Sequence, residues 1–334
     1  MTLKEIAKIV GVSSSTVSLV LNNRDGVSTS TRERVESALR ENNYVPRKQN
    51  KSGKSDSTNI YVVKYATHGM IVEENQGFIS AIIDQIIQES NHASFDVNIV
   101  NCTKNTLEQV ISDIGNSSAK GIIFIGTELT NSQIHLLTNI RSPLVVVDNA
   151  CMYQNLNTIL MTNQDIGYIA TKHLIDAGYQ EIGYLYSNAT SSNFYWRRCG
   201  YEIAIKENQV KMGVNIPITP TLQKSYEDMC CYLKTVRSLP KAFFADNDTI
   251  AIGAIKAMQE FGYNVPEDVS IIGVDNIPYS AICNPPLTTV SISRIEMGKQ
   301  AVSLLRYIIN NPDSPPLRIQ VCGELMLRKS TKPA

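Results

Sequence analysis

The sequence predicts an α/β protein with a small all-helical head, followed by two doubly wound lobes that are each built on a parallel sheet. Three observations support this fold class. Two short apolar stripes at helical spacing flank a glycine near the N-terminus, and a polar, basic stretch follows them. Beyond it, short apolar runs alternate with amphipathic stretches. At 334 residues, the chain is long enough for two or three domains.

The segment EIAKIVGVSSSTVSLVLNN (5–23) predicts two short helices joined by a turn at Gly11, where a chain often needs a positive φ. Thr2 and Glu5 have capping-box spacing for the first helix, and Ser13 or Ser14 can cap the second. The apolar side chains expected to face the core are Ile6, Ala7, Ile9, Val10, Val17, Val20 and Leu21.

A third helix is predicted over 28–43, with Ser28 as its cap and Val35, Ala38 and Leu39 as its apolar stripe. Three short helices of this kind form a helix-turn-helix unit, whose second helix enters the major groove with its N-terminus first. Hydroxyls at that end can reach base edges or phosphates. The head residues predicted to contact DNA are Thr2, Ser13, Ser14, Ser15, Thr16, Ser18, Leu19 and Asn22.

Charge is distributed unevenly along the chain, although the net charge is zero. Residues 1–54 contain ten basic and five acidic residues, whereas the remainder contains 21 basic and 26 acidic residues. This asymmetry predicts a polyanionic partner for the head only. A solvated helical surface with extra lysine and arginine is the alternative, and charge by itself does not choose between them.

The rest of the composition argues against several classes of protein. The seven cysteines form no CxxC pair and the four histidines are isolated, so we expect neither a disulfide framework nor a metal site, and no cofactor. No signal-peptide pattern and no apolar run of membrane-spanning length is present. We therefore expect a cytoplasmic protein with reduced thiols and no membrane partner.

After residue 58, two βαβ series predict two lobes with parallel sheets flanked by helices. The strands expected in the first series are 59–65, 96–100, 121–126 and 143–148, with helices at 76–90, 106–118 and 130–140. The strands expected in the second are 182–186, 241–246 and 269–275, with helices at 163–178, 194–208 and 248–262. Two such lobes with a cleft between them suit a small ligand.

Ligands of parallel sheets bind outside the carboxyl ends of the strands, and this rule selects Asp148, Asn247, Asp248 and Asp275. Asp275 is the strongest candidate, because a carboxylate accepts two hydrogen bonds from vicinal hydroxyls. Asp248 is better placed to cap the following helix than to contact a ligand. As alternatives to ligand contact, Asp148 can be an ordinary loop residue, and Asn276 can shape a turn.

The head resembles that of the LacI/GalR family of bacterial repressors. The residues that carry this resemblance are TLKEIAKIVGVSSSTVSLVLNN (2–23) and GVSTSTRERVESALRENNYVP (26–46). Leu19 stands where the family string TVSRVLN has an arginine that reads guanine. A leucine cannot make that bidentate contact; it can pack against a thymine methyl or be neutral.

The segment YVPRKQNKSGKSDSTNI (44–60) reads as a linker, and the resemblance places a hinge helix of the form P-N-x-x-A-R-x-L there. Gly53 falls at the position of the leucine that wedges into the minor groove, and Lys48 and Asn50 replace the alanines. Two interpretations stay open. Either the hinge is a flexible tether, or it binds DNA by charge through Arg47, Lys48, Lys51 and Lys54.

The resemblance continues through the body. WRRCGYEIAI (196–205) implies an effector-binding arginine at Arg197, ADNDTIAIGAIKAM (245–258) points to Asn247 and Asp248, and VPEDVSIIGVDN (265–276) points to Asp275. NPPLTTVSISRIEMGKQAV (284–302) matches the crossover back to the first lobe. The resemblance implies a dimeric body like the type I periplasmic binding proteins, with sugars as the usual effectors and nucleobases as occasional ones.

Aromatic side chains offer an apolar face for a sugar ring. Phe78, Phe194, Tyr195 and Trp196 are the candidates, with core packing as the alternative for Phe78 and Trp196. We expect the acidic loop THGMIVEENQG (67–77) to be solvated. The residues predicted to contact the effector are Phe78, Asp148, Phe194, Trp196, Arg197, Asn247 and Asp275.

These observations predict a helix-turn-helix domain at 1–45, a hinge at 46–58, and an effector-binding and dimerisation domain at 59–334. Lobe 1 is expected over about 59–161 and 291–321, and lobe 2 over about 162–290 and 322–334. We predict that the protein is a sequence-specific transcriptional regulator that acts as a repressor. As a homodimer it binds operator DNA, and a small ligand, most simply a sugar, controls its affinity from the cleft.

Three other classes of protein are alternatives to this predicted function. An α/β enzyme is disfavoured because GxGxxG, GxxxxGK[ST], GxSxG and HExxH are all missing from the sequence, so we predict no enzymatic activity. A periplasmic binding protein is disfavoured by the attached helix-turn-helix. A regulator controlled by a protein partner stays open, although the pair Arg197 and Asp275 favours a small ligand.

Overall fold

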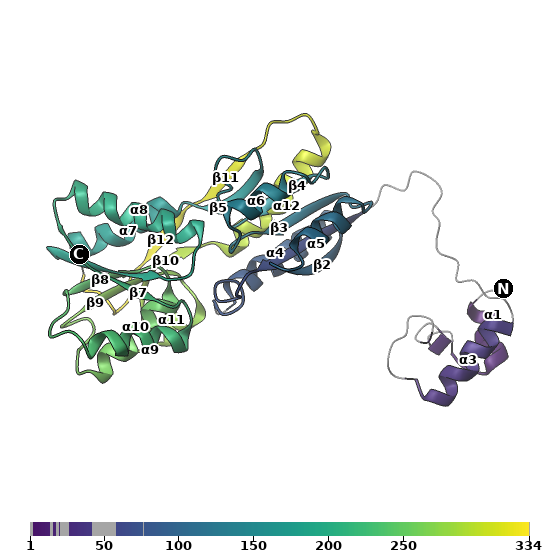
Figure 1. The fold of residues 1–334 in the computed structure, drawn as a ribbon, viewed down its shortest axis with the longest axis horizontal. Helices are drawn as coiled ribbons and strands as arrows, with labels where there is room; N and C mark the ends of the chain where they lie inside the picture. Colours follow the sequence, from purple (N-terminus) through teal and green to yellow (C-terminus); the bar gives the residue numbers. More distant parts are fainter. Residues whose placement is uncertain are drawn as a thin grey trace. The chain divides into compact units, whose positions relative to one another are not determined.

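The chain divides into a head, residues 1–56, and a body, residues 57–334 (Figure 1). The computed structural model describes residues 3–13, 16–17, 20, 27–41, 58–75 and 77–333.

In the head, α1 (Leu3–Val10) and α3 (Thr29–Glu41) pack around a small apolar core, and residues 16–17 and 20 are also helical. Gly11 has φ = 72°, the left-handed turn that the sequence predicts between the first two helices. The buried members of the core are Ala7, Val10, Val17, Val20, Val35 and Ala38. Ile9 is 56% exposed, so its predicted burial is wrong. It lies roughly 200° around the helix from the buried Ala7.

Serine hydroxyls cap two helices of the head. Ser13 Oγ accepts a hydrogen bond from Thr16 N at 3.1 Å, and Ser28 Oγ accepts one from Thr31 N at 3.3 Å. Arg34 donates to the carbonyl oxygen of Val10 at 2.7 Å and so ties α3 to the end of α1. The other predicted DNA-contacting residues lie outside the described residues: Thr2, Ser14, Ser15, Ser18, Leu19, Asn22, Arg47, Lys48 and Lys51.

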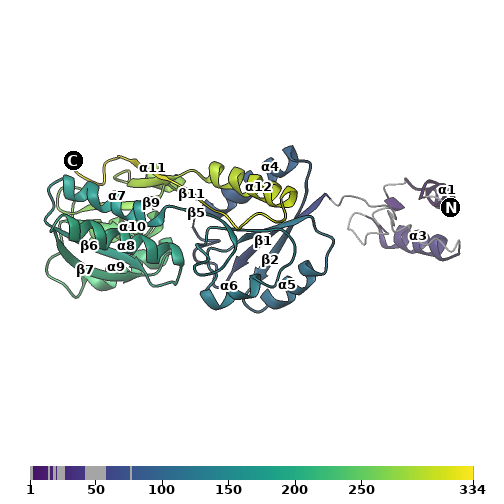
Figure 2. The same ribbon diagram turned by 90° about the horizontal axis from the view of Figure 1, so that it is seen from above.

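The first lobe of the body is a parallel six-stranded sheet in the order β11-β5-β4-β3-β1-β2. Its strands are β1 (Asn59–Ala66), β2 (Asp96–Thr103), β3 (Gly121–Ile125), β4 (Leu144–Val147), β5 (Asn157–Met161) and β11 (Arg318–Val321). Its helices are α4 (Phe78–His92), α5 (Leu107–Gly115), α6 (Asn131–Leu137) and α12 (Arg294–Asn310). Figure 2 shows α4 and α12 on one face of the sheet and α5 and α6 on the other.

The second lobe is a six-stranded sheet in the order β12-β10-β9-β8-β6-β7, parallel except for β12. Its strands are β6 (Glu181–Ser187), β7 (Lys211–Ile218), β8 (Ala242–Ala245), β9 (Ser270–Asp275), β10 (Thr288–Ile292) and β12 (Gly323–Met326). Its helices are α7 (Asn163–Asp176), α8 (Ser192–Glu207), α9 (Leu222–Leu233), α10 (Asp248–Glu260) and α11 (Pro278–Ile282). The pair α7 and α8 covers one face, and α9 and α10 cover the other (Figure 1).

The predicted fold class is therefore confirmed: two doubly wound, parallel-rich α/β lobes follow a helical head. The chain passes between the sheets three times, after β5, after β10 and after β11. These crossings bring the carboxyl ends of β1, β3 and β4 to face those of β6, β8 and β9, so loops from both sheets line one cleft. No helix in the described part of the chain is long and apolar enough to cross a membrane.

Candidate functional site: a buried polar cleft between the lobes

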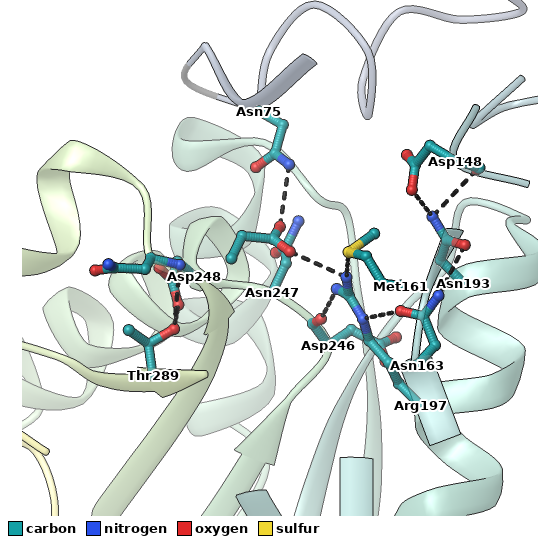
Figure 3. A network of polar contacts seen from close by, with 12 residues as sticks. Asn75, Asp148, Met161, Asn163, Asn193, Arg197, Asp246, Asn247, Asp248 and Thr289 are labelled. Atoms are coloured by element: carbon teal, nitrogen blue, oxygen red, sulfur yellow. Dashed lines mark hydrogen bonds and ion pairs between the residues drawn. The ribbon is translucent and has the colours of Figure 1, made fainter. Parts of the chain in front are cut away.

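Arg197 is the centre of the cleft and is 2% exposed. Its Nε donates to Asn163 Oδ1 at 2.9 Å, and one terminal nitrogen donates to the carbonyl oxygen of Asp246 at 2.5 Å. The other terminal nitrogen lies 3.0 Å from Asp275 Oδ1 and forms a buried ion pair with it. The same nitrogen lies 3.7 Å from Met161 Sδ, so four neighbours hold the guanidinium in place (Figure 3).

Two glycines explain why Arg197 lies where it does. A Cβ on Gly167 of α7 would lie 2.0 Å from the carbonyl oxygen of Arg197, and one on Gly200 of α8 would lie 2.0 Å from that of Gln164. Only glycine permits this approach of the two helix backbones. The glycine in the motif WRRCG therefore serves helix packing, and the packing presents Arg197 to the cleft.

Asp275 ends β9 with φ = 107°, which is unusual for any residue except glycine. Besides Arg197, it accepts a hydrogen bond from Asn75 Nδ2 at 3.1 Å, which reaches it from lobe 1. Burial raises the pKa of its carboxyl group, although the Arg197 charge and the bond from Asn75 act in the opposite direction. This carboxylate is thus one of the points at which the two lobes meet.

Asp148 directly follows β4 on the lobe 1 side, with φ = 64°. It accepts hydrogen bonds from Thr127 Oγ1 at 2.7 Å and Asn193 Nδ2 at 2.9 Å. Burial raises its pKa to about 6, against the lowering by Thr127 and Arg197. Asn193 in turn accepts from Asn163 Nδ2 at 3.0 Å, so one polar network runs from Asp148 to Arg197 (Figure 3).

The helix cap predicted at Asp248 is wrong. Asn247, not Asp248, caps α10, since its Oδ1 accepts from Ile250 N at 2.9 Å. Asp248 is the first residue of the helix and accepts from Ile277 N at 3.0 Å and Thr289 Oγ1 at 2.5 Å. The cap must precede the first helical residue, and the helix begins one residue earlier than a cap at Asp248 requires.

The side-chain nitrogen of Asn247 is buried and has no hydrogen-bond partner among the described residues. Asn247 lines the central cavity, together with Phe78, Phe194, Arg197 and Asp275. Buried polar atoms in folded proteins are nearly always paired, so this nitrogen is available to a ligand. The cavity itself is about 10 Å³, which is room for about one water molecule.

Trp196 lies outside the central cavity. It is half-buried and lines a neighbouring groove, whereas the other six residues predicted to contact the effector line the central cavity. The sequence pattern placed Trp196 beside Arg197, but adjacent residues of a helix point about 100° apart.

The loop at 67–77 is only partly solvated, contrary to the prediction. Glu73 and Glu74 are exposed as expected, but Ile71, Val72 and Asn75 are buried. Asn75 crosses to lobe 2, where it donates to Asp275 at 3.1 Å and accepts from Thr249 Oγ1 at 3.3 Å. Sequence reasoning missed Asn75 because a single asparagine in an acidic loop carries no signal.

Glu128 holds this loop and is itself 2% exposed. Its Oε2 accepts from the backbone nitrogens of Thr67, His68 and Gly69 at 2.7, 3.0 and 3.2 Å. Its Oε1 accepts from those of Ile71 and Val72 at 3.0 and 3.2 Å. Burial opposes its charge, yet these bonds and the nearby His68 hold the pKa of Glu128 below its usual range.

Glu128 and Thr127 were also missed, although a signal for them exists. Both follow β3, whose carboxyl end faces the cleft as those of β4 and β9 do. The same rule selects Asp246 after β8 and Asn163 after β5. Asp246 accepts from Tyr184 Oη and from Ser187 N at 2.7 Å, and burial raises its pKa to about 7.

Comparisons with known proteins agree with this architecture. Residues 2–47 match the family of bacterial regulatory proteins, lacI family, and residues 171–331 match a periplasmic binding protein-like domain. The chain is 33% identical to the HTH-type transcriptional repressor PurR of Haemophilus influenzae (strain PittEE) and 34% identical to that of Pasteurella multocida (strain Pm70). Each alignment covers 99% of this chain and 98% of the relative.

Solved structures share the fold. The Lac repressor dimer bound to operator and the anti-inducer ONPF is similar with a TM-score of 0.75 at 24% identity. The transcriptional regulator CelR–cellobiose complex is similar with a TM-score of 0.73 at 22% identity. Both similarities cover 99% of each chain.

Proposed function

The chain belongs to the LacI family of bacterial regulatory proteins, and on this premise we propose that a sugar bound between its lobes controls operator binding. Like its relatives, the chain is a DNA-binding transcriptional repressor and not an enzyme. The observation that carries the effector proposal is the buried pair of Arg197 and Asp275 beside Asn247 Nδ2, which has no hydrogen-bond partner among the described residues.

The chemistry of the cleft suits a neutral, hydroxyl-rich ring. Arg197 and Asn247 donate hydrogen bonds, Asp275 accepts them, and Phe78 and Phe194 add apolar walls. Among the residues that line the cavity, Asp148 and Asp275 outnumber the one guanidinium, that of Arg197, so this lining disfavours an anionic ligand such as a sugar phosphate.

Binding requires the cleft to change. The central cavity has room for about one water molecule, and Asn75 of lobe 1 is bonded to Asp275 of lobe 2. An effector must therefore displace Asn75 and reseat the lobes against each other. The effector shifts the balance between the two arrangements only by the difference in its affinity for them.

We further propose that the repressor acts as a homodimer in the cytoplasm, where its operator is. Two heads reading the half-sites of a pseudo-palindromic operator require a fixed spacing. A change in lobe arrangement alters that spacing, and this is the route by which the effector controls operator affinity.

A purine base is the second candidate effector, and the relatives named PurR favour it. Arg197 can donate to a ring carbonyl while Asp275 accepts from a ring N–H, and Phe78 and Phe194 can pack against the ring faces. The site chemistry admits both classes, so they are compared directly in the test.

The test is a thermal-shift screen of the full chain against monosaccharides, disaccharides and purine bases. A ligand at 100-fold excess over its Kd adds roughly 2.7 kcal/mol to the free energy of unfolding. We expect a sugar to raise the Tm of the wild type and of Arg198→Ala, an exposed neighbour, but not of Arg197→Ala or Asn247→Ala. Fluorescence anisotropy of a selected operator duplex then measures whether the same sugar changes DNA affinity.

Other outcomes discriminate between the alternatives. A response to purine bases only selects the second candidate. No response to any compound argues for control by a protein partner and contradicts the effector proposal, while operator binding by the head stands independently.

A further inference from the structure

One loop of lobe 1 directs its backbone N–H groups at a single carboxylate. This loop, residues 67–75, is called the strap, and five of its backbone nitrogens donate to Glu128 at 2.7–3.2 Å. Among them lies Met70, whose backbone nitrogen donates to His68 Nδ1 at 3.2 Å. Gly69 has φ = 76°, and a left-handed turn of this kind makes successive N–H groups converge. The strap therefore has the backbone geometry of an anion-binding nest.

Glu128 is a buried anion whose main counter-charges are backbone groups. Its side chain is fully buried, and in the part of the chain that the structure describes no lysine or arginine forms an ion pair with it. Lys64 of β1 pairs with Glu73 at 3.0 Å instead. Burial raises the pKa of Glu128, but the backbone hydrogen bonds, with a contribution from His68, lower it further than burial raises it. The nest thus stabilises a negative charge where water does not reach.

The far end of the strap carries Asn75 across to lobe 2. Asn75 donates to Asp275 at 3.1 Å and accepts from Thr249 Oγ1 at 3.3 Å (Figure 3). Its carbonyl oxygen accepts from Phe78 N at 3.0 Å, where α4 begins. A short segment held at both ends has few alternative conformations, so the bonds to Glu128 at one end limit where Asn75 lies at the other.

We propose that residues 67–72 form an anion site that Glu128 fills from within, and that this filling holds Asn75 on Asp275. Glu128 does not line the central cavity, so it is a positioning residue that acts on the cleft through Asn75. While the site is filled, Asn75 occupies one oxygen of Asp275 and keeps it from other donors. The proposal involves no effector and holds whether the cleft binds a sugar or a purine base.

Glu128→Ala with added acetate tests the anion site. The methyl carbon of acetate stands for Cγ of Glu128, and its carboxylate stands for the one removed. Hydrogen exchange of the full chain, followed by peptide-resolved mass spectrometry, measures the amides of residues 67–72. We expect these amides to exchange about 10-fold faster in the variant, equivalent to roughly 1.4 kcal/mol of lost hydrogen bonding. Sodium acetate should restore the protection by binding the folded state.

Three controls separate a specific site from a general salt effect. Sodium chloride at equal ionic strength should restore nothing, and propionate, which is one carbon longer, should restore less than acetate because it overfills the space. Glu202→Ala removes an exposed carboxylate of α8 that pairs with Arg198. Its exchange at 67–72 should match the wild type with and without acetate.

A double-variant cycle measured by urea unfolding tests the link to Asn75. In the wild-type background, Asn75→Ala should raise the equilibrium constant of unfolding about 5-fold, as expected for the loss of one hydrogen bond. In Glu128→Ala the same substitution should change it little, because Asn75 is no longer held on Asp275. Acetate should restore the effect. Asn188→Ala removes an exposed asparagine outside the strap and should have the same effect in both backgrounds.

The possible failures are distinct. Restoration by chloride as well as by acetate, or by neither, would overturn the anion site. An absent effect of Asn75→Ala in the wild type, or an equal effect in Glu128→Ala, would overturn the link to Asn75. Neither measurement uses an effector or an operator, so a failure of this proposal leaves the function proposed above intact.

Glu128→Asp is the second variant, for the case that Glu128→Ala does not fold. Its carboxylate is drawn back by one methylene, so exchange at 67–72 should be faster than in the wild type. The effect of Asn75→Ala should also be smaller in this background. Exchange and coupling equal to those of the wild type would contradict the proposal.

Discussion

The two walls of the cleft are built from different kinds of structure. On the lobe 2 side, Arg197, Asn247 and Asp275 are placed by a helix, a helix N-terminus and a strand end, all tightly packed. On the lobe 1 side, Asn75 lies on an irregular loop that depends on the single carboxylate of Glu128. The lobe 2 groups proposed to contact a ligand thus lie on regular elements, whereas Asn75, which donates to Asp275, lies on a loop.

The strongest test of the lobe 2 wall is Arg197→Ala. It leaves Asp275 buried without its cation, and breaking a buried ion pair in this way costs about 3–5 kcal/mol. Urea unfolding measures the loss. Arg198→Ala is the matched control, because its ion pair with Glu202 is exposed and should change stability by less than about 1 kcal/mol. Similar losses in both variants would contradict the assignment of Arg197 as the central buried charge.

Gly167→Ala tests whether helix packing places Arg197. The added methyl group would lie 2.0 Å from the carbonyl oxygen of Arg197, so α7 and α8 must separate, at a cost of about 2–3 kcal/mol. Effector affinity should fall with stability, although no ligand contact is removed. Gly115→Ala at the end of α5, where a Cβ meets nothing within 4 Å, is the control. Unchanged effector affinity in Gly167→Ala would contradict this positioning role.

Glu128→Gln tests the lobe 1 wall. Replacing a carboxylate that accepts five backbone hydrogen bonds should lower the free energy of unfolding by about 2 kcal/mol at pH 7. The pKa of Glu128 is lower in the folded state than its ordinary value of 4.5. The charged side chain therefore stabilises the fold fully at pH values above 4.5. This stabilisation is lost as the pH falls through the lowered pKa of the folded state. The difference between wild type and variant should therefore shrink in acid, and a constant difference would contradict the role of the charge.

Asp148 should show the opposite pH dependence. Its pKa rises from 3.8 to about 6 on folding, so the folded state holds a proton that the unfolded state releases. Stability should consequently fall as the pH rises from about 4 to about 6 and then level off. Urea unfolding of Asp148→Asn across this range should show a flatter profile than the wild type. An unchanged profile would show that Asp148 does not titrate in this way.

Asn75→Ala gives the smallest expected effect. It frees one oxygen of Asp275 from a hydrogen bond worth about 1 kcal/mol, so an effector should bind about 5-fold more tightly. Calorimetry with the sugar found in the screen measures the change. Asn188→Ala removes an exposed asparagine whose Nδ2 donates to Thr219 and should leave affinity unchanged. Weaker binding in Asn75→Ala would mean that Asn75 contacts the effector and does not compete with it.

Much of the site could be predicted because its residues belong to local patterns. Arg197 lies in WRRCG, Asp275 at the end of an apolar strand, and Asn247 just before a helix, and each pattern spans a few residues. The helix cap, predicted at Asp248 but found at Asn247, shows the limit of such patterns. A shift of one residue in the start of a helix changes which side chain caps it and which turns to neighbouring elements.

Asn75 and Glu128 could not be predicted, because their roles depend on contacts between distant parts of the chain. Asn75 meets Asp275 across 200 residues of sequence, and Glu128 meets Ile71 across 57. Nothing within either local segment specifies these partners. The same holds for Trp196, whose position in the groove follows from the orientation of α8 against the loops after β3 and β4.

The sequence by itself determined the family, the two doubly wound lobes and the identity of the central charged pair. Hydrophobic periodicity and strand-end motifs each span a few neighbouring residues, so they can be recognised without knowing the contacts between distant parts of the chain. Only the tertiary structure decided which polar groups close the cleft, which lack partners, and where the groove lined by Trp196 lies. Those features arise where separate loops pack together, and the free energy of a buried polar group depends on every neighbour that surrounds it.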